Sequence, residues 1–240
     1  MGVIQVKIGS LALALALWLL PLTKGGYGRA AVTSVSKYRA SQYRELGLSY
    51  QQQGRYPEAI AAMKKSVEFD PGNITGRVNL GWAQHLVGQE DAAQESLVQA
   101  LYREPRSIPA LNALGIVYLV SGYLASAVVV HTWAAVLKPD DEIAYYNLSL
   151  AFQRLRLYDS AIKTATRAAA LEPNNPHPFL ALAIAHWNKG ERTLAKKAYR
   201  QALNLDSRYS DRAILAYLKK AGFSSDQIRT TQLILSAQRD

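Results

Sequence analysis

The chain has 240 residues, 49% of them hydrophobic, which allows one elongated repeat domain or one to two globular domains. It contains no cysteine, and this excludes disulfides, thiolate metal sites and cysteine nucleophiles. The formal net charge of +10 favours anionic partners, such as acidic proteins, anionic lipid surfaces or nucleic acid. The basic residues are scattered without a run of five or more, so we interpret them mainly as a solvated surface.

The N-terminal segment carries the first recognisable signal. Residues 8–22 form a largely apolar run of 15 residues after Lys7, shorter than the roughly 20 residues that span a bilayer. Such a length is typical of the apolar region of a secretory signal peptide, and Gly28 and Ala30 provide the small residues at the −3 and −1 positions of a cleavage site after Ala30. We therefore expect residues 1–30 to be a signal peptide and the mature chain to be exported to a periplasm, lumen or extracellular space.

The charges around this run favour an alternative. Only Lys7 precedes the run, whereas four basic residues follow it: Lys24, Arg29, Lys37 and Arg39. By the positive-inside bias, residues 1–30 would then be an uncleaved membrane anchor whose C-terminal side stays in the cytoplasm. In either case we expect residues 31–39 to be a linker.

Residues 40–209 consist of five tandem repeats of 34 residues, at 40–73, 74–107, 108–141, 142–175 and 176–209. One column of the repeat is leucine: Leu46, Leu80, Leu114, Leu148 and Leu182. A second column is alanine: Ala59, Ala93, Ala127, Ala161 and Ala195. A third column is small throughout: Ser66, Ala100, Ala134, Ala168 and Ala202. Each repeat closes on a helix-stopping position: Pro71, Pro105, Pro139, Pro173 and finally Ser207.

The columns predict a pair of helices in every repeat. Small side chains are needed where two helices approach closely, because a large one would push them apart. Between the two helices a glycine recurs that favours the left-handed conformation at a helix end, at Gly54, Gly88, Gly122 and Gly190, with Arg156 in its place in the fourth repeat. The closing proline prevents the second helix from continuing.

The first repeat, YRELGLSYQQQGRYPEAIAAMKKSVEFDP at residues 43–71, resembles the tetratricopeptide-repeat (TPR) family nearly throughout. The resemblance extends over residues 40–209 in the columns above. It implies an all-α fold, a right-handed superhelical solenoid of antiparallel helix pairs whose concave face is lined by the first helix of each pair. It also implies a protein or peptide ligand in the concave groove.

Residues 210–240 are expected to cap the last repeat, because a repeat cannot bury its apolar face alone. Residues 210–221 suggest an amphipathic helix with Ile214, Tyr217 and Leu218 on one side, ended by Gly222. Ser224 and Gln227 have the spacing of a capping box that begins a second helix.

The resemblance also places the candidate partner-binding residues on the first helices. Two groove columns form an apolar stripe with two large aromatic anchors, and asparagines beside it can bond to a ligand backbone, which suits an extended or helical apolar segment. The candidate residues are Leu48, Asn79, Trp82, His85, Asn112, Ile116, Leu119, Asn147, Leu150, Gln153, Ile184 and Trp187. An alternative stays open: the stripe packs against neighbouring first helices, or the N-terminal tail or the C-terminal cap covers it.

The third repeat differs from the others on its second helix. Val129 and Trp133 occupy two positions that are mostly polar or charged in the other repeats, and Val136 extends the apolar patch. An exposed apolar patch usually marks an interface, so these residues are a candidate second contact surface for a partner, a membrane or a second subunit. The alternative is a small, inert patch.

Catalytic and metal-binding motifs are not found. The four histidines do not form an HExxH motif, and His131 falls in a core column of the repeat. No nucleophile elbow or phosphate-binding glycine loop occurs. We therefore expect a non-enzymatic scaffold or adaptor without metal or cofactor, one that helps to assemble a membrane or envelope complex. The alternative function is a basic surface that binds nucleic acid or anionic lipid.

Overall fold

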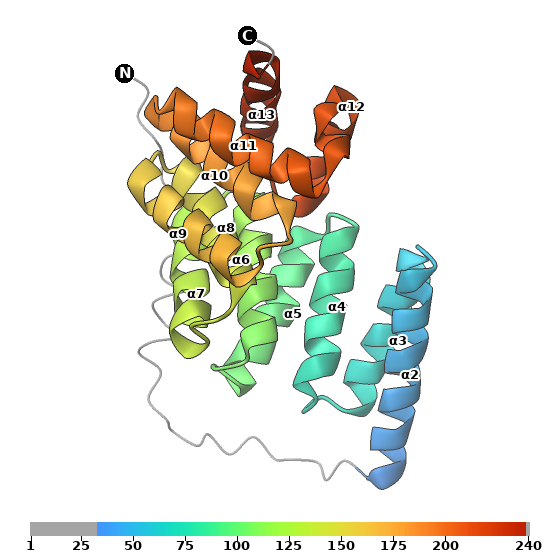
Figure 1. Cartoon of the computed structure of the whole chain (residues 1–240). Helices are drawn as coiled ribbons and strands as arrows, with labels where there is room; N and C mark the ends of the chain where they lie inside the picture. The colour runs from blue at the N-terminus through green and yellow to red at the C-terminus, as the bar shows by residue number, and fades with distance from the viewer. Residues whose placement is uncertain (1–32, 239–240) are drawn as a thin grey trace. The chain divides into compact units, whose positions relative to one another are not determined.

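The computed structural model describes residues 33–238, which form helices and turns with no strand among them (Figure 1). These residues divide into two compact units, one ending at Val117 and the other beginning at Tyr118. We call them unit 1 and unit 2. Each is built from consecutive helices that pack against each other in pairs, which confirms the predicted all-α stack of helix pairs.

Unit 1 contains four complete helices and the first part of a fifth. They are α2 (Ser34–Gln52), α3 (Tyr56–Phe69), α4 (Ile74–Leu86), α5 (Glu90–Arg103) and α6 (Ile108–Ser121). Helix α2 begins after Thr33, whose hydroxyl accepts a hydrogen bond from the backbone N–H of Ser36. Residues 34–39, expected to be a linker, are therefore the first turns of α2. The predicted signal peptide or anchor at residues 1–30 lies outside the described residues.

Unit 2 contains the rest of α6 and the remaining helical elements. They are α7 (Leu124–Leu137), α8 (Glu142–Arg154), α9 (Tyr158–Leu171), α10 (Pro176–Lys189), α11 (Arg192–Leu205), η2 (Ser207–Ser210), α12 (Arg212–Leu215), η3 (Ala216–Ala221) and α13 (Ser225–Ala237). Between Thr33 and Gln238, no helix has the length and apolar composition needed to cross a bilayer.

The small-residue columns lie where the helices of a pair touch. Ala59, Ala93, Ala127, Ala161 and Ala195 are all 0% exposed. A Cβ added to Gly81 on α4 would lie only 2.7 Å from Leu97 Cγ and 3.2 Å from the carbonyl oxygen of Ala93 on α5. The two backbones thus approach so closely that even a methyl group would force a rearrangement.

The turn between the two helices of the fourth repeat confirms the role of the glycine column. Gly54, Gly88, Gly122 and Gly190 all have positive φ, and Arg156 adopts the same left-handed conformation with φ of 60°. The backbone N–H of Arg156 donates to the carbonyl of Gln153, and that of Leu157 donates to Phe152, so two otherwise unpaired carbonyls at the end of α8 are satisfied. The hydrogen-bonded turn is therefore kept without glycine.

The region after α11 differs from the predicted amphipathic helix over residues 210–221. It consists of three short elements, two of them 3₁₀-helices. The buried leucines are Leu215 and Leu218, three residues apart, which suits the three residues per turn of a 3₁₀-helix. Tyr217, predicted on the buried side, is 62% exposed. The predicted capping box of Ser224 and Gln227 is confirmed at the start of α13.

Candidate functional site

The first helices of unit 1 present a partly open face. Leu48 on α2 is 38% exposed, and Asn79, Trp82 and His85 on α4 and Ile116 on α6 are half-buried. The rings of Trp82 and His85 lie 5.1 Å apart, and Nδ1 of His85 lies 2.8 Å from Oε2 of Glu90, which orients the imidazole. Asn112 is 7% exposed and belongs to the interior of this face. An apolar and aromatic surface with polar edges remains accessible here.

Gln51 adds an acceptor to the same face, one helical turn after Leu48. Its Oε1 atom is buried and meets no hydrogen-bond donor from the part of the chain that the structure describes. A buried carbonyl oxygen without a donor costs about 1–3 kcal/mol. An N–H group of a ligand would satisfy this atom, and Gln51 occupies the same groove column of the repeat as His85, Leu119, Gln153 and Trp187.

In unit 2 the corresponding face is covered. Leu119, Leu150 and Ile184 are 0% exposed, and Asn147 and Gln153 are 4% exposed. Nε2 of Gln227, on α13, donates to the backbone carbonyl of Leu150 at 3.3 Å and to Oε1 of Gln153 at 3.0 Å. Nε2 of Gln153 in turn donates to the carbonyl of Ala181 on α10 at 2.9 Å. A buried amide network thus joins α8, α10 and α13.

The residues before α13 continue this cover. The hydroxyl of Tyr146 on α8 donates to the carbonyl of Ala221 at 2.6 Å, and its ring centroid lies 6.1 Å from that of Phe223. A Cβ added to Gly222 would lie 3.4 Å from Cδ1 of Leu150 and 3.9 Å from Cδ2 of Leu119. The C-terminal segment of the chain therefore lies on these candidate residues, and partner binding by them stays a prediction that requires the segment to move.

Trp187, the second aromatic anchor, lies at the end of α10 and is half-buried. The guanidinium of Arg192 stacks on its ring at 3.7 Å from the centroid, and Nη1 of the same arginine donates to the carbonyl of Trp187 at 2.9 Å. This cation–π contact covers one face of the indole with the chain's own charge.

The candidate second surface lies on α7, in unit 2. Val136 is 62% exposed, whereas Val129 and Trp133 are half-buried. Helix α7 contains no charged residue, and its exposed residues are Thr132 and Val136. Its role as an interface stays a prediction. His131, on the same helix, is 0% exposed, which confirms the core position predicted for it.

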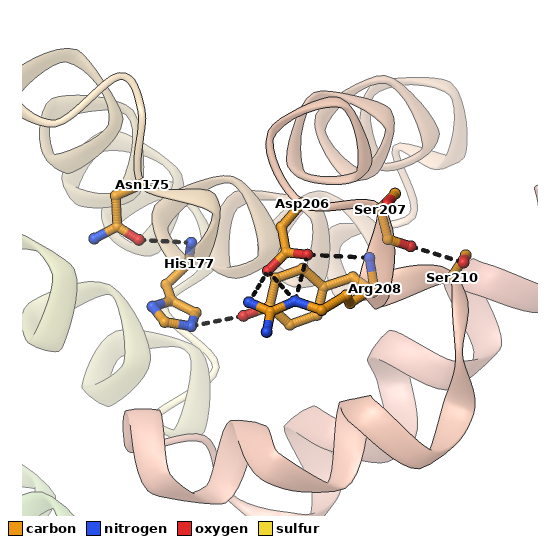
Figure 2. Close-up of polar contacts among 7 residues, drawn as sticks. Asn175, His177, Asp206, Ser207, Arg208 and Ser210 are labelled. Carbon is orange, nitrogen blue, oxygen red and sulfur yellow. Dashed lines mark hydrogen bonds and ion pairs between the residues drawn. The ribbon is translucent and has the colours of Figure 1, made fainter.

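A polar cluster that the sequence pattern did not reveal holds the start of the C-terminal segment (Figure 2). Nε2 of His177 and the hydroxyl of Tyr209 share a hydrogen bond of 2.9 Å, and the carboxylate of Asp206 accepts from the backbone and side chain of Arg208. Burial lowers the pKa of His177, and the neighbouring Asp206 opposes this shift. The hydroxyl of Tyr199 donates to the carbonyl of Tyr209 at 2.9 Å. Partners 10 and 32 residues apart in sequence made this cluster hard to predict.

Glu142 begins α8 one turn before Tyr146 and has an unusual environment. Burial raises the pKa of Glu142 to about 7, and the nearby carboxylates of Glu172 and Asp141 add to the rise. Its Oε1 atom is buried without a hydrogen-bond donor in the described region. The folded chain therefore holds this proton more tightly than the unfolded chain, whose glutamate has the ordinary pKa of 4.5.

We expect the contribution of Glu142 to the free energy of unfolding to fall as the pH rises from 5 to 8, because the folded state keeps the Glu142 proton over this interval whereas the unfolded state releases it. Glu142→Gln should leave the stability at pH 5 nearly unchanged and raise it at pH 8 by about 1–2 kcal/mol, after allowance for solvent screening. Urea denaturation of both proteins at the two pH values measures the difference. His177 is common to both proteins and its contribution cancels in the comparison. If the free energy of unfolding changed equally with pH in both proteins, Glu142 would not be the group with the raised pKa.

Two family models match parts of this chain, and both describe the same repeat. A model of the tetratricopeptide repeat matches residues 40–73, and a second model of this repeat matches residues 143–175 and 177–209. Over 161 residues the chain is 27% identical to the BBSome complex member BBS4 of Bos taurus, an alignment that covers 67% of this chain and 31% of that protein. The chain thus spans less than a third of this relative.

Two solved structures share the fold. The crystal structure of MamA protein is 24% identical with a TM-score of 0.61, and the match covers 72% of this chain and 94% of MamA. TTC0263, a thermophilic TPR protein of Thermus thermophilus, is 23% identical with a TM-score of 0.60, and the match covers 70% of this chain and 92% of TTC0263. At these sequence identities, both structures support the fold of this chain and nothing more.

Proposed function

We propose, from the premise that this chain is a tetratricopeptide-repeat protein, that it is a non-enzymatic adaptor and that the first-helix face of unit 1 binds an apolar segment of a partner protein. One observation carries the proposal. Leu48, Trp82 and His85 remain accessible on this face, beside the unpaired acceptor of Gln51. Gln153, three repeats after Gln51, has its own acceptor satisfied by Gln227.

The chemical groups on the first-helix face of unit 1 indicate what kind of partner segment it binds. Trp82 is a large, half-buried aromatic side chain of the kind that contributes most of the binding energy at many interfaces. Gln51 accepts a hydrogen bond and Asn79 can both donate and accept, so the two suit the main chain or a side-chain amide of a ligand. The partner segment is therefore apolar, and an N–H group on it would pair with Gln51 after the buried amide side chain turns toward the ligand.

In its more specific form, the proposal is that this chain is exported or membrane-anchored and helps to assemble a membrane or envelope complex. Its support is the apolar run at residues 8–22 and the likeness to BBS4, whose name describes a member of a complex. The candidate surface of Val129, Trp133 and Val136 would provide a second contact for such an assembly. Affinity purification from native membrane and soluble fractions, with N-terminal sequencing of the recovered chain, tests location, cleavage and partnership together.

The test of the adaptor role compares two variants of the full chain. Trp82→Ala should reduce recovery of a specific partner protein at least about tenfold, because an aromatic anchor is lost. Tyr102→Ala, which removes another aromatic side chain of unit 1 that is 63% exposed on α5, should leave recovery unchanged. Circular dichroism should show equal helicity for both.

Two results would contradict the adaptor proposal. One is equal recovery of the partner by both variants. The other is the absence of a specific protein partner together with binding to DNA or anionic vesicles that falls steeply with salt, which would favour the alternative of a basic binding surface.

A further inference from the structure

We propose that the first-helix face of unit 2 is a helix-binding site whose resident ligand is α13, and that a partner helix with the same side-chain pattern displaces α13. This inference rests on the proposed adaptor function and names a second class of ligand for it, an amphipathic helix with an amide side chain in its first turn.

The position of α13 differs from that of a helix that only covers the last repeat. A Cβ added to Gly222 would lie 3.9 Å from Cδ2 of Leu119 in the third repeat, and Gln227 is hydrogen-bonded to the backbone carbonyl of Leu150 in the fourth. Helix α13 then packs on α10 and α11 of the fifth repeat, and Nε2 of Gln238 donates to the carbonyl of Lys196. The C-terminal segment thus crosses the first helices of three successive repeats, as a ligand of this face would.

The buried side of α13 has the spacing of a helix that lies in a groove. Gln227, Thr231, Ile234 and Leu235 are all buried, at the i, i+4, i+7 and i+8 positions. Asp226 and Arg229 lie on the exposed side and pair with each other at 2.9 Å. Helix α13 therefore contacts the rest of unit 2 through a single buried face.

The recognition centre is the amide of Gln227. Its Nε2 donates to two acceptors of α8, while its Oε1 accepts from the backbone N–H of Ser224 and so completes the capping box. A helix that replaces α13 buries Oε1 of Gln153 again, which is costly unless that helix supplies a donor in place of Gln227. A competing helix must therefore carry an amide side chain at its third position, after a Ser, Thr, Asp or Asn cap.

The ligand pattern also includes the residue before the capping residue. Phe223 is 2% exposed and precedes the cap residue Ser224, with Tyr146 as an aromatic neighbour. The ligand pattern is thus an aromatic residue, a capping residue, two residues of any kind, glutamine, and apolar residues seven and eight positions after the glutamine. This pattern identifies a class of helix rather than a particular protein.

Under this proposal α13 opens from Gly222 onward, while Leu215 and Leu218 of the connector before it stay buried. The connector contains two 3₁₀-helices of four and six residues and a four-residue α-helix, and it ends at Gly222 with φ of +86°. Such short elements have few internal hydrogen bonds, and 3₁₀ stretches often coincide with hinges. The alanine columns that join α8 to α9 and α10 to α11 lie outside α13, so these pairs keep their contacts when α13 opens.

Amide hydrogen exchange on the full chain tests whether α13 opens by itself. We expect amides of residues 225–237 to exchange through an opening at least about tenfold more frequent than the opening of α8 and α10. Exchange of α13 only together with α8 and α10 would overturn the proposal, since α13 would then be a permanent part of the fold.

A synthetic peptide of residues 222–238 provides the ligand in a second experiment. It should bind a full-chain variant with Phe223→Ala and Gln227→Ala at least about tenfold more tightly than it binds the unmodified chain, whose site is occupied in cis. A peptide in which Gln227 is replaced by alanine should bind weakly, and a chain with Arg229→Ala should behave as the unmodified one. Equal binding to both chains, or no binding to either, would overturn the proposal. Partner capture through Trp82 is measured separately in unit 1, so the adaptor function can stand when this inference fails.

Discussion

Ala59→Leu is expected to lower the free energy of unfolding by about 3 kcal/mol, near the upper end of what overpacking of a core costs. Ala59 is 0% exposed on α3, and its carbonyl oxygen lies 3.2 Å from the position that a Cβ on Gly47 of α2 would take. Three additional carbon atoms at this point have no space, because the two backbones already define the distance between the helices. The stability is measured by urea denaturation followed by far-ultraviolet circular dichroism.

Ala61→Leu is the matched control, since Ala61 lies on the same helix but is exposed. It should change the free energy of unfolding by no more than about 0.5 kcal/mol. A similar loss for both variants would mean that α3 does not tolerate leucine for a reason other than its contact with α2, and the close-approach explanation would fail.

Leu150→Ala is expected to cost about 3 kcal/mol of stability, because a leucine that is 0% exposed would leave a cavity between α8 and the C-terminal segment. The same change should increase hydrogen exchange in α13, since the side chain of Leu150 lies beside Gly222, where an added Cβ would be 3.4 Å from its Cδ1 atom, and the backbone carbonyl of Leu150 accepts from Gln227. Denaturation and exchange measurements on one protein preparation test the two effects together.

Leu48→Ala is the control for that prediction, because Leu48 has the same position three repeats earlier and is 38% exposed. It should cost less than about 1 kcal/mol and should instead weaken binding of a partner to unit 1. Equal losses of stability at the two positions would show that the C-terminal segment does not determine the burial of this column.

The sequence predicts the fold well because close helix contacts impose a simple requirement on residue size. The alanine column was predicted to lie between helices, and all five members are fully buried. The leucine column shows the limit of such reasoning: Leu114 is 0% exposed, whereas Leu46 is 41% exposed. Leu46 belongs to the first repeat, and within the described residues 33–238 no helix before α2 packs against it, so leucines at the same position of the repeat differ in burial.

The candidate site was harder to predict because its state depends on contacts between distant residues. Gln227 and Gln153 are 74 residues apart, and Tyr146 and Ala221 are 75 residues apart. The repeat pattern places Gln153 and Leu150 on a binding face but gives no register for a segment outside the repeats. The capping box predicted the start of α13 because Ser224 and Gln227 interact within one turn.

A double-mutant cycle between Gly81 and Leu97 tests most directly whether closely touching helix pairs build this molecule. Gly81→Ala should destabilise unit 1 because the new methyl group would meet Leu97 Cγ at 2.7 Å, and Leu97→Ala should destabilise it by leaving a cavity. The double variant should be more stable than the sum of the two losses predicts, by about 1 kcal/mol or more, since each change accommodates the other. Additive losses would contradict the close contact of α4 and α5 on which the account rests.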